Sequence, residues 1–540
     1  MGLTALLFAA GFLAISARLV QISAEGSGFT APSAGSPAST QASRADIIDR
    51  NGRLLATDVP IDALFADARH IWNPREAAKQ LVSVLPDLDE AALFAKLSSG
   101  QAFVWIKRDL TPKQYAAVRS LGIAGLGIRR EQTRVYPNGR AAAHILGYVD
   151  IDNRGIAGVE RSLNDRLSEA SAQGAPVALS IDLRVQHILE DVLSGARAEF
   201  QAIGATGLVL DVHSGEILGM ASLPDYDPNH PPLPTGPDAH ALFNQATLGV
   251  YEMGSTFKTF TTAMALDSGR VSLASEFDAT KPIAFGRFRI RDYHPLNRWL
   301  SVTEIFQHSS NIGSARIALA FGGEAQREFL KRVGMLEAPA LELPERGKPL
   351  LPHRWGEIET MTISYGHGIA VSPIQVSAGM AAMANGGLYI TPTLLRRQPN
   401  APLPATRVIS EETSATMRDL LRLVVVDGTG GKADVPGYPV GGKTGTAEKA
   451  SGGGYARKAL ISSFVGVFPA LQPRYLVLVI LDEPQPTPET HGYATAGWTA
   501  APTVSKIVAR IAPLLGLEPE PVAAPQEDPS ATRMAVADDR

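Results

Sequence analysis

The chain has 540 residues, more than one compact core holds, so at least two domains are predicted. Its formal net charge of −4 gives no sign of a nucleic-acid partner. The absence of cysteine excludes disulfides, thiolate metal sites and cysteine nucleophiles, and the 11 histidines lack ligand-like spacing, so neither a metal nor a cofactor is predicted.

The N-terminus is apolar and uncharged from Gly2 to Ala17, and the apolar character resumes after Arg18. A membrane-spanning helix needs about 20 apolar residues, which residues 1–22 supply if Arg18 reaches the interface. We therefore predict an uncleaved membrane anchor over 1–22; a cleaved signal peptide is the alternative. Residues 23–43, rich in Ser, Ala, Gly, Thr and Pro, predict a flexible linker.

Residues 44–175 read as a mixed α/β domain. Arg44 to Ala56 predicts two strands joined by an Asn-Gly turn, and helical periodicity follows over 74–98 and 111–121. No nucleophile–base pair is visible here, so a structural or docking role is predicted, that of a pedestal. His144 is interpreted as a packing or hydrogen-bonding residue rather than a catalyst.

Residues 176–517 form a second predicted domain. Val177 to Ile181 predicts a short strand, and Asp182 can cap the helix after it. Gly207 to Ala221 predicts a hairpin that begins an antiparallel sheet. The other predicted elements are helices over 302–307, from Ser314, from Pro373 to Asn385, over 417–426 and over 502–517; strands over 440–447, 461–468 and 475–481; a mobile loop over 448–457; and a disordered tail over 518–540.

The motif Ser255-x-x-Lys258 starts an apolar run with helical spacing. Residues three apart share one face of a helix, so the Ser255 hydroxyl and the Lys258 amine are expected side by side. The helix dipole favours an alkoxide at the N-terminus, and a lysine with a lowered pKa can take the hydroxyl proton. The motif therefore predicts a nucleophile and its base. An exposed Ser and Lys on an ordinary helix is the alternative.

A second motif, Ser309-x-Asn311, follows the helix over 302–307. Ser309 is expected to relay a proton between Lys258 and a leaving amine. The amide of Asn311 offers a donor and an acceptor, which suits a substrate peptide group. The alternative for both residues is helix capping.

The third motif is Lys443-Thr444-Gly445-Thr446. Lys443 is the expected second cation, which would lower the pKa of the base. The backbone N–H groups of Ser255 and Thr446 are the candidate oxyanion hole. Without a side chain, Gly445 would let a substrate backbone lie along this strand, and the Thr444 and Thr446 hydroxyls with Lys443 could bind a carboxylate. The alternative is a plain hairpin strand.

The ordered set of three motifs is the signature of serine β-lactamases and penicillin-binding proteins. With it, the chain resembles a class B penicillin-binding protein of the division type, the FtsI family, over about residues 44–515. Asn311 and the Gly-His-Gly of the stretch 364–368 favour this type over the elongation type. The supporting stretches are Ile47–Gly52, Arg134–Pro137, His144–Gly147, Gly158–Glu160, Leu179–Asp182, Asp211–Met220, Tyr251–Lys258, Ser364–Gly368 and Gly441–Ala447.

The resemblance implies an α+β protein of the inner membrane with a periplasmic pedestal and a transpeptidase domain, whose five-stranded antiparallel sheet is flanked by helices. It implies that Ser255 is acylated by the D-Ala-D-Ala end of a peptidoglycan stem peptide, and by β-lactams. It also implies partnership with the septal glycosyltransferase FtsW and other division proteins. The alternatives are an elongation-type transpeptidase, a D,D-carboxypeptidase or β-lactamase on the same fold, and a non-catalytic β-lactam sensor or scaffold.

Overall fold

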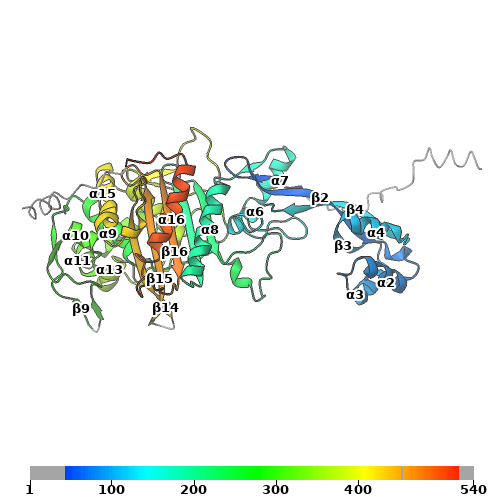
Figure 1. Cartoon of the computed structure of the whole chain (residues 1–540), viewed down its shortest axis with the longest axis horizontal. Helices are drawn as coiled ribbons and strands as arrows, with labels where there is room; N and C mark the ends of the chain where they lie inside the picture. Colours follow the sequence, from blue (N-terminus) through cyan, green and yellow to red (C-terminus); the bar gives the residue numbers. More distant parts are fainter. Residues whose placement is uncertain (1–42, 287, 452–453, 522–540) are drawn as a thin grey trace, which may run out of the picture. The chain divides into compact units, whose positions relative to one another are not determined.

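The computed structural model describes residues 43–286, 288–451 and 454–521 (Figure 1). The predicted anchor over 1–22, nearly all of the linker over 23–43 and most of the tail over 518–540 lie outside the described residues. Among the described helices, none combines the length and the apolar character that a membrane crossing requires.

The first sheet is built from the N-terminal third of the chain. Its strand order is β3-β2-β1-β5, with β4 also paired to the long β2. The predicted strand–turn–strand at 44–56 is present, with β2 running further than expected. The strands are β1 (Ile47–Ile48), β2 (Leu54–Ala66), β3 (Val104–Leu110), β4 (Leu126–Val135) and β5 (Val177–Ala178).

Short capped helices pack near one end of this sheet. The helical pattern over 74–98 is two helices, α2 (Pro74–Val84) and α3 (Glu90–Leu97), because Pro86 interrupts the backbone and Asp89 starts a new N-cap. The predicted helix at 111–121 is α4 (Pro112–Ser120), which Thr111 closes with a capping box. Three more helices follow: α5 (Ala143–Leu146), α6 (Gly158–Ser162) and α7 (Asn164–Ala172).

A buried cluster of ion pairs joins strands β2 and β4 of this sheet to helix α6. The Glu160 carboxylate lies 2.7 Å from guanidinium nitrogens of both Arg44 and Arg134, and all three side chains are buried. Arg134 also pairs with Asp58 at 3.0 Å. His144 is buried nearby in sequence, 2.8 Å from the Ala241 carbonyl through Nε2, which agrees with its predicted hydrogen-bonding role.

The second sheet is antiparallel and five-stranded, in the order β14-β15-β16-β6-β7 (Figure 1). The order places β14, which carries the third motif, at an edge. The predicted hairpin at 207–221 is the pair β6 and β7. The strands are β6 (Gly204–Asp211), β7 (Ile217–Leu223), β14 (Gly441–Ser451), β15 (Gly454–Phe468) and β16 (Tyr475–Asp482).

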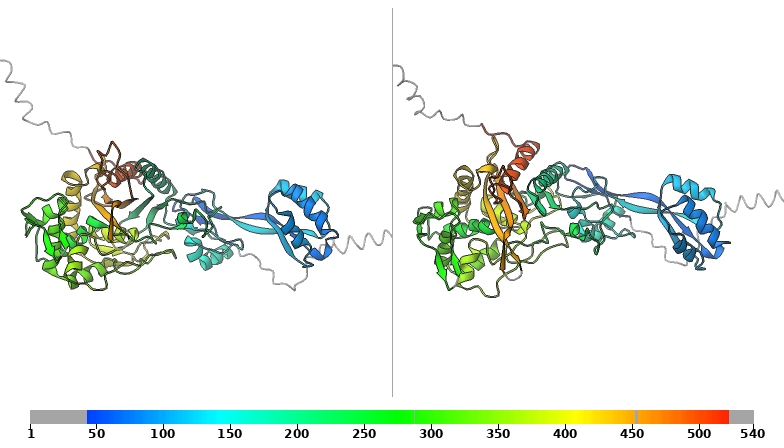
Figure 2. Two further views of the ribbon diagram at one scale, coloured as in Figure 1. Left: turned by 90° about the horizontal axis from the view of Figure 1, so that it is seen from below. Right: turned by 60° about the horizontal axis from the view of Figure 1, so that its bottom comes forward.

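Both faces of this sheet are covered by helices, which explains why β16 reads as a continuous apolar run. Alternate residues Leu476 and Leu478 belong to one buried core, while Val477 and Val479 belong to the other. Helices α8 (Leu183–Glu199) and α16 (Ala500–Leu514) cover the second face, as Figure 1 and Figure 2 show. The first face packs against α9 (Lys258–Asp267), α14 (Pro373–Ala384) and α15 (Glu411–Asp427).

Several predicted boundaries hold. Asp182 caps α8, and Ser372 caps α14 with a capping box. The remaining elements are η1 (Ala68–His70), η2 (Ala239–Leu242), η3 (Gly254–Phe257), β8 (Glu276–Asp278), β9 (Ile283–Phe285), β10 (Phe288–Ile290), β11 (Trp299–Ser301), α10 (Val302–Gln307), α11 (Asn311–Phe321), α12 (Gly323–Arg332), α13 (Glu357–Ile363), β12 (Leu388–Ile390), β13 (Ala405–Arg407) and η4 (Gly431–Ala433).

Three predictions were wrong. Helix α11 begins three residues before the predicted Ser314, because Ser310 caps it. Helix α15 begins at Glu411, capped by Ser410, rather than at Met417. The mobile loop predicted over 448–457 is mostly strand, since β14 runs on to Ser451 and β15 starts at Gly454; polar and glycine content hid the pairing.

Candidate active site

The Ser255 side chain sits on the 3-10 turn η3 that leads into α9. Gly254 begins this turn with φ of +51°, a conformation that favours glycine. A Cβ on Gly254 would lie 2.8 Å from the Thr446 carbonyl oxygen. The candidate nucleophile is therefore held directly against strand β14, with the backbones of the first and third motifs in contact.

The Lys258 amine lies at the centre of the first two motifs. Its Nζ is 3.0 Å from Ser255 Oγ, 3.0 Å from Ser309 Oγ and 2.8 Å from Asn311 Oδ1, and it also contacts the Ser309 carbonyl. Its side chain is fully buried. The expected proximity of Ser255 and Lys258 is therefore present, and the lysine has four oxygen neighbours.

The two lysines of the motifs meet at one hydroxyl. Lys443 Nζ donates to Ser309 Oγ at 3.0 Å, the same oxygen that Lys258 contacts. Burial lowers the pKa of Lys258 well below its usual range, and the charge of Lys443 lowers it further, while Asp292 opposes both. Burial lowers the pKa of Lys443 to about 7. At neutral pH the Lys258 amine is therefore the neutral one and is available as a base.

The Ser309–Asn311 motif is braced by a residue that no sequence motif announces. The Asp292 carboxylate accepts hydrogen bonds from Ser310 Oγ at 2.7 Å and from the Ile312 N–H at 2.9 Å. Ser309 has φ of +57°, in the left-handed region that few non-glycine residues adopt and that recurs at functional sites. A single acid in a polar loop carries no signal in the sequence, so Asp292 was missed.

The amide of Asn311 is engaged at both ends. Its Oδ1 faces Lys258, and its Nδ2 donates to the Arg291 carbonyl at 2.9 Å. These contacts orient the Lys258 amine, and the role of Asn311 in binding a substrate peptide group stays a prediction. Helix capping, the alternative for this motif, falls to Ser310, which accepts from the Gly313 N–H.

The hydroxyls of β14 are held by neighbouring loops. Thr444 Oγ1 lies 2.7 Å from Thr429 Oγ1, and Thr446 Oγ1 accepts from the Ala496 N–H at 3.1 Å. Among the described strands, β15 alone pairs with β14. The other edge of β14 therefore offers backbone groups to an extended ligand.

Gly445 packs against the turn that carries the nucleophile. A Cβ there would lie 2.5 Å from the Met253 carbonyl, 2.5 Å from Ser463 Oγ and 2.6 Å from Thr256 Oγ1. Glycine is thus required for the close packing of β14 on this turn, and the approach of a substrate backbone to this strand stays a prediction.

A pocket of about 540 Å³ opens onto Ser255. It combines residues of all three motifs with aromatic side chains and histidines that sequence analysis did not assign to the site. Its lining residues include Ser255, Tyr365, His367, Thr446, Glu448 and Trp498.

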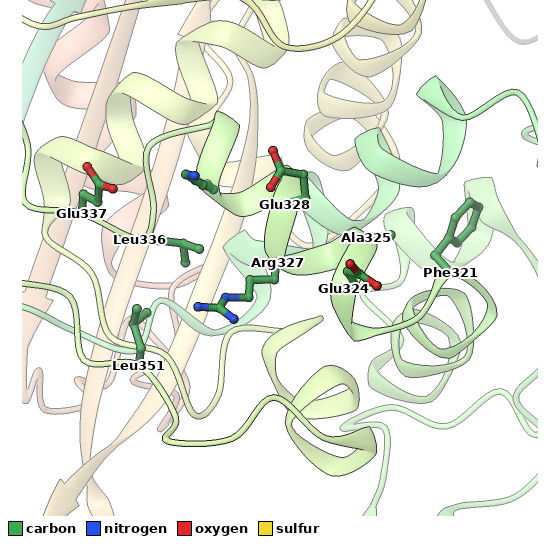
Figure 3. Close-up of a pocket in the computed structure, with 9 residues that line it drawn as sticks. Phe321, Glu324, Ala325, Arg327, Glu328, Leu336, Glu337 and Leu351 are labelled. Atoms are coloured by element: carbon green, nitrogen blue, oxygen red, sulfur yellow. The ribbon is translucent and has the colours of Figure 1, made fainter.

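A second hollow, of about 770 Å³, lies beside α12 (Figure 3). It is lined by the apolar side chains of Phe321, Leu336 and Leu351 and by charged side chains such as Arg327 and Glu328. No residue of the three motifs lines it, so volume alone does not locate the chemistry of this chain.

Comparison with known protein families gives two matches. Residues 205–509 match the penicillin binding protein transpeptidase domain. Residues 39–174 match the penicillin-binding protein dimerisation domain. The first match spans the three motifs and the five-stranded sheet, and the second spans most of the first sheet.

Relatives of similar length share both parts. The chain is 42 % identical over 489 residues to a protein named probable peptidoglycan D,D-transpeptidase FtsI from Caulobacter vibrioides, covering 88 % of this chain and 82 % of the relative. It is 31 % identical to peptidoglycan D,D-transpeptidase FtsI from Escherichia coli, covering 88 % and 84 %. A crystal structure of a peptidoglycan synthetase from Bifidobacterium adolescentis has a TM-score of 0.69 at 24 % identity, covering 90 % and 97 %, and supports the fold.

Proposed function

Because the chain belongs to the penicillin-binding protein transpeptidase family, we propose that it is a serine-type D,D-transpeptidase that cross-links peptidoglycan stem peptides. The names of its FtsI relatives support a role in the septal wall of dividing cells. The observation that carries the proposal is the buried group of Ser255, Lys258, Ser309 and Lys443, in which both amines contact one hydroxyl.

In the first half-reaction, neutral Lys258 accepts the Ser255 proton as Oγ attacks the carbonyl of the penultimate D-Ala. The oxyanion then accepts hydrogen bonds from the backbone N–H groups of Ser255 and Thr446, whose proximity follows from the Gly254–Thr446 contact. Ser309, between the two lysines, returns the proton to the departing D-Ala amine. The product is an acyl-enzyme ester on Ser255.

The donor peptide is proposed to bind as an added strand along the open edge of β14. Thr444, Gly445 and Thr446 supply the backbone groups of that edge. The buried Lys443, with the Thr444 and Thr446 hydroxyls, supplies the counter-charge for the terminal carboxylate. A β-lactam presents the same carbonyl and carboxylate, so it is proposed to acylate the same serine.

Labelling with a fluorescent penicillin tests this function. The wild-type chain should become covalently labelled, and Ser255→Ala should lose the label while keeping its unfolding midpoint. An exposed serine on another element, Ser120→Ala on α4, is the matched control. Persistent labelling of Ser255→Ala, or an unlabelled wild type, would reject the mechanism, and rapid release of hydrolysed drug would indicate a β-lactamase.

For the whole protein we propose the organisation that the resemblance implies. Residues 1–22 anchor the chain in the inner membrane, 23–43 form the linker, 44–175 the pedestal and 176–517 the periplasmic catalytic domain, with a tail over 518–540. Septal partners such as the glycosyltransferase FtsW would then act beside it. Depletion should produce filamentous cells; cells that lose rod width instead would indicate an elongation enzyme.

A further inference from the structure

The turn over 364–368 is packed on the backbone that precedes the nucleophile. Gly366 has φ of +82°, and a Cβ on it would lie 2.2 Å from the Gly254 carbonyl oxygen. Thr261 of α9 donates to the Ser364 carbonyl at 2.9 Å, which fixes the start of the turn. The turn therefore has one position relative to Ser255.

His367 stands in this turn between two glycines with positive φ, Gly366 and Gly368. The backbone N–H of His367 donates to the Thr362 carbonyl at 3.0 Å. The centroid of its imidazole ring lies 5.3 Å from that of the Tyr365 ring. The half-buried side chain lines the same pocket as Ser255. The imidazole is thus held in the pocket wall by its turn. It has no role in the proposed acylation of Ser255.

Two carboxylates act on this wall: one holds the turn of His367, and the other lines the pocket. Glu252, three residues before Ser255, accepts the Gly368 N–H at 2.9 Å through Oε1. Glu448, two residues after Thr446, lines the pocket and carries the only carboxylate among the described residues that do so. This wall therefore offers negative charge, whereas the charged form of Lys443 on the other side repels a cation.

The titratable groups that act on His367 are Glu252, just before η3, Lys258 of α9 and Glu448 of β14. Burial lowers the pKa of His367; Glu252 opposes this shift, Lys258 of α9 adds to it, and Glu448 of β14 opposes it. The imidazole is therefore neutral at neutral pH and can accept a proton.

We propose that His367 and Glu448 form the acceptor half of the site: the Glu448 carboxylate attracts the primary ammonium group of the incoming stem peptide, and His367, in the turn that Glu252 holds through the Gly368 N–H, removes one proton from it. The inference deepens the proposed transpeptidation and rests on it. It assigns to His367 the removal of the first proton from the attacking amine.

In the second half-reaction, the ammonium group of the acceptor gives one proton to the imidazole of His367 and becomes a neutral amine. Its nitrogen attacks the ester carbonyl, so a C–N bond forms and the bond from carbon to Ser255 Oγ breaks. The second N–H proton passes through Lys258 to Ser255 Oγ, and the imidazolium returns its proton to solvent.

Separate measurement of the two half-reactions tests the inference. The purified full chain is acylated with a fluorescent penicillin, and in parallel with a thioester analogue of the donor peptide in the presence of glycinamide or hydroxylamine. Glycinamide must lose a proton before it attacks, whereas hydroxylamine is already neutral at neutral pH. The variants are His367→Gln and Glu448→Gln, and the control is His353→Gln, an exposed histidine of a distant loop.

We expect His367→Gln to keep penicillin acylation within about twofold of the wild type. Its transfer to glycinamide should fall roughly 10²-fold relative to hydrolysis, while its transfer to hydroxylamine stays unchanged. With rising pH the wild-type transfer rate should level off once the imidazole is neutral, whereas that of the variant should keep rising. Glu448→Gln should raise the KM for glycinamide and leave that for hydroxylamine unchanged.

An unchanged glycinamide-to-hydrolysis ratio in both variants would overturn the inference. An equal loss with hydroxylamine would also overturn it, because it would indicate a structural role for the turn. These outcomes differ from failure of the proposed function, in which the wild type itself would transfer its acyl group to neither amine. If His367→Gln does not fold, Glu448→Gln decides the question alone.

Discussion

Lys258 and Lys443 each place their amine 3.0 Å from the same Ser309 hydroxyl. Two buried ammonium groups cannot share that position cheaply, so one of them must be neutral. Since the charge of Lys443 adds to burial in lowering the pKa of Lys258, whereas burial alone lowers that of Lys443, the residue beside the nucleophile is the neutral one.

Replacing Lys443 by Met should raise the pKa of Lys258, because it removes the neighbouring positive charge. Less of the Lys258 amine is then neutral at a given pH. The acidic limb of the pH profile for penicillin acylation should move to higher pH, with a loss of roughly tenfold or more at neutral pH. Lys506→Met, on the surface of α16, is the control. An unmoved limb would mean that burial alone sets the pKa of Lys258.

Gly366→Ala should disrupt the site through a backbone contact. The new Cβ would lie 2.2 Å from the Gly254 carbonyl oxygen, in addition to the strain of a positive φ. We expect a loss of about 3 kcal/mol in the free energy of unfolding and loss of penicillin labelling. Gly269→Ala is the control, because Gly269 has φ of +68° and open space around it; it should cost about 1 kcal/mol and keep labelling. Equal costs would refute the contact argument.

Removing the carboxylate of Glu160 should destabilise the first sheet. Glu160→Ala leaves Arg44 and Arg134 buried without their common partner, which typically costs about 3–5 kcal/mol. Glu199→Ala breaks an exposed pair with Lys506 and should cost under about 1 kcal/mol. Urea unfolding of the two variants measures the difference, and similar midpoints would contradict the role assigned to the cluster.

Glu190 should make stability depend on pH. Burial raises its pKa to about 7, even though Gln186 and the Ala142 N–H donate to it. The folded state therefore holds a proton that the unfolded state releases near its ordinary pKa, so the stabilising contribution is present at low pH. It is lost as the pH rises towards about 7.

Relative to Glu190→Gln, the wild type should thus lose up to about 3 kcal/mol of unfolding free energy between pH 4.5 and 7.5 and little above that range. Urea unfolding of both proteins across this range measures the change. A constant difference between them would show that Glu190 keeps an ordinary pKa.

Local signals explain which parts of the fold were predictable. Asp182 and Ser372 announce helix starts because capping needs only nearby residues. Ser310 was missed because it lies inside a motif that was read as chemistry, and the extension of β14 was missed because pairing with β15 overrides local composition.

The residues of the site also differ in how far the sequence predicts their positions. Ser255 and Lys258 are neighbours on a helical turn, so their contact follows from spacing. Their meeting with Lys443 depends on the packing of a distant strand, and it was expected from the ordered set of three motifs rather than from spacing. Asp292 and Glu448 have no motif at all, because their importance comes from what the fold brings beside them.

The open edge of β14 carries a risk of aggregation, which the residues around it limit. An unpaired strand edge invites pairing with the sheet of another molecule, which leads to aggregation. At the opposite edge, β7 is covered where the Asp182 N–H donates to the Leu218 carbonyl and the Ile217 N–H to the Thr393 carbonyl. The β14 edge, in contrast, forms a wall of a pocket that also includes Trp498 and Tyr365. These walls favour a single extended peptide as the ligand of the open edge, which limits the risk of pairing with the sheet of another molecule.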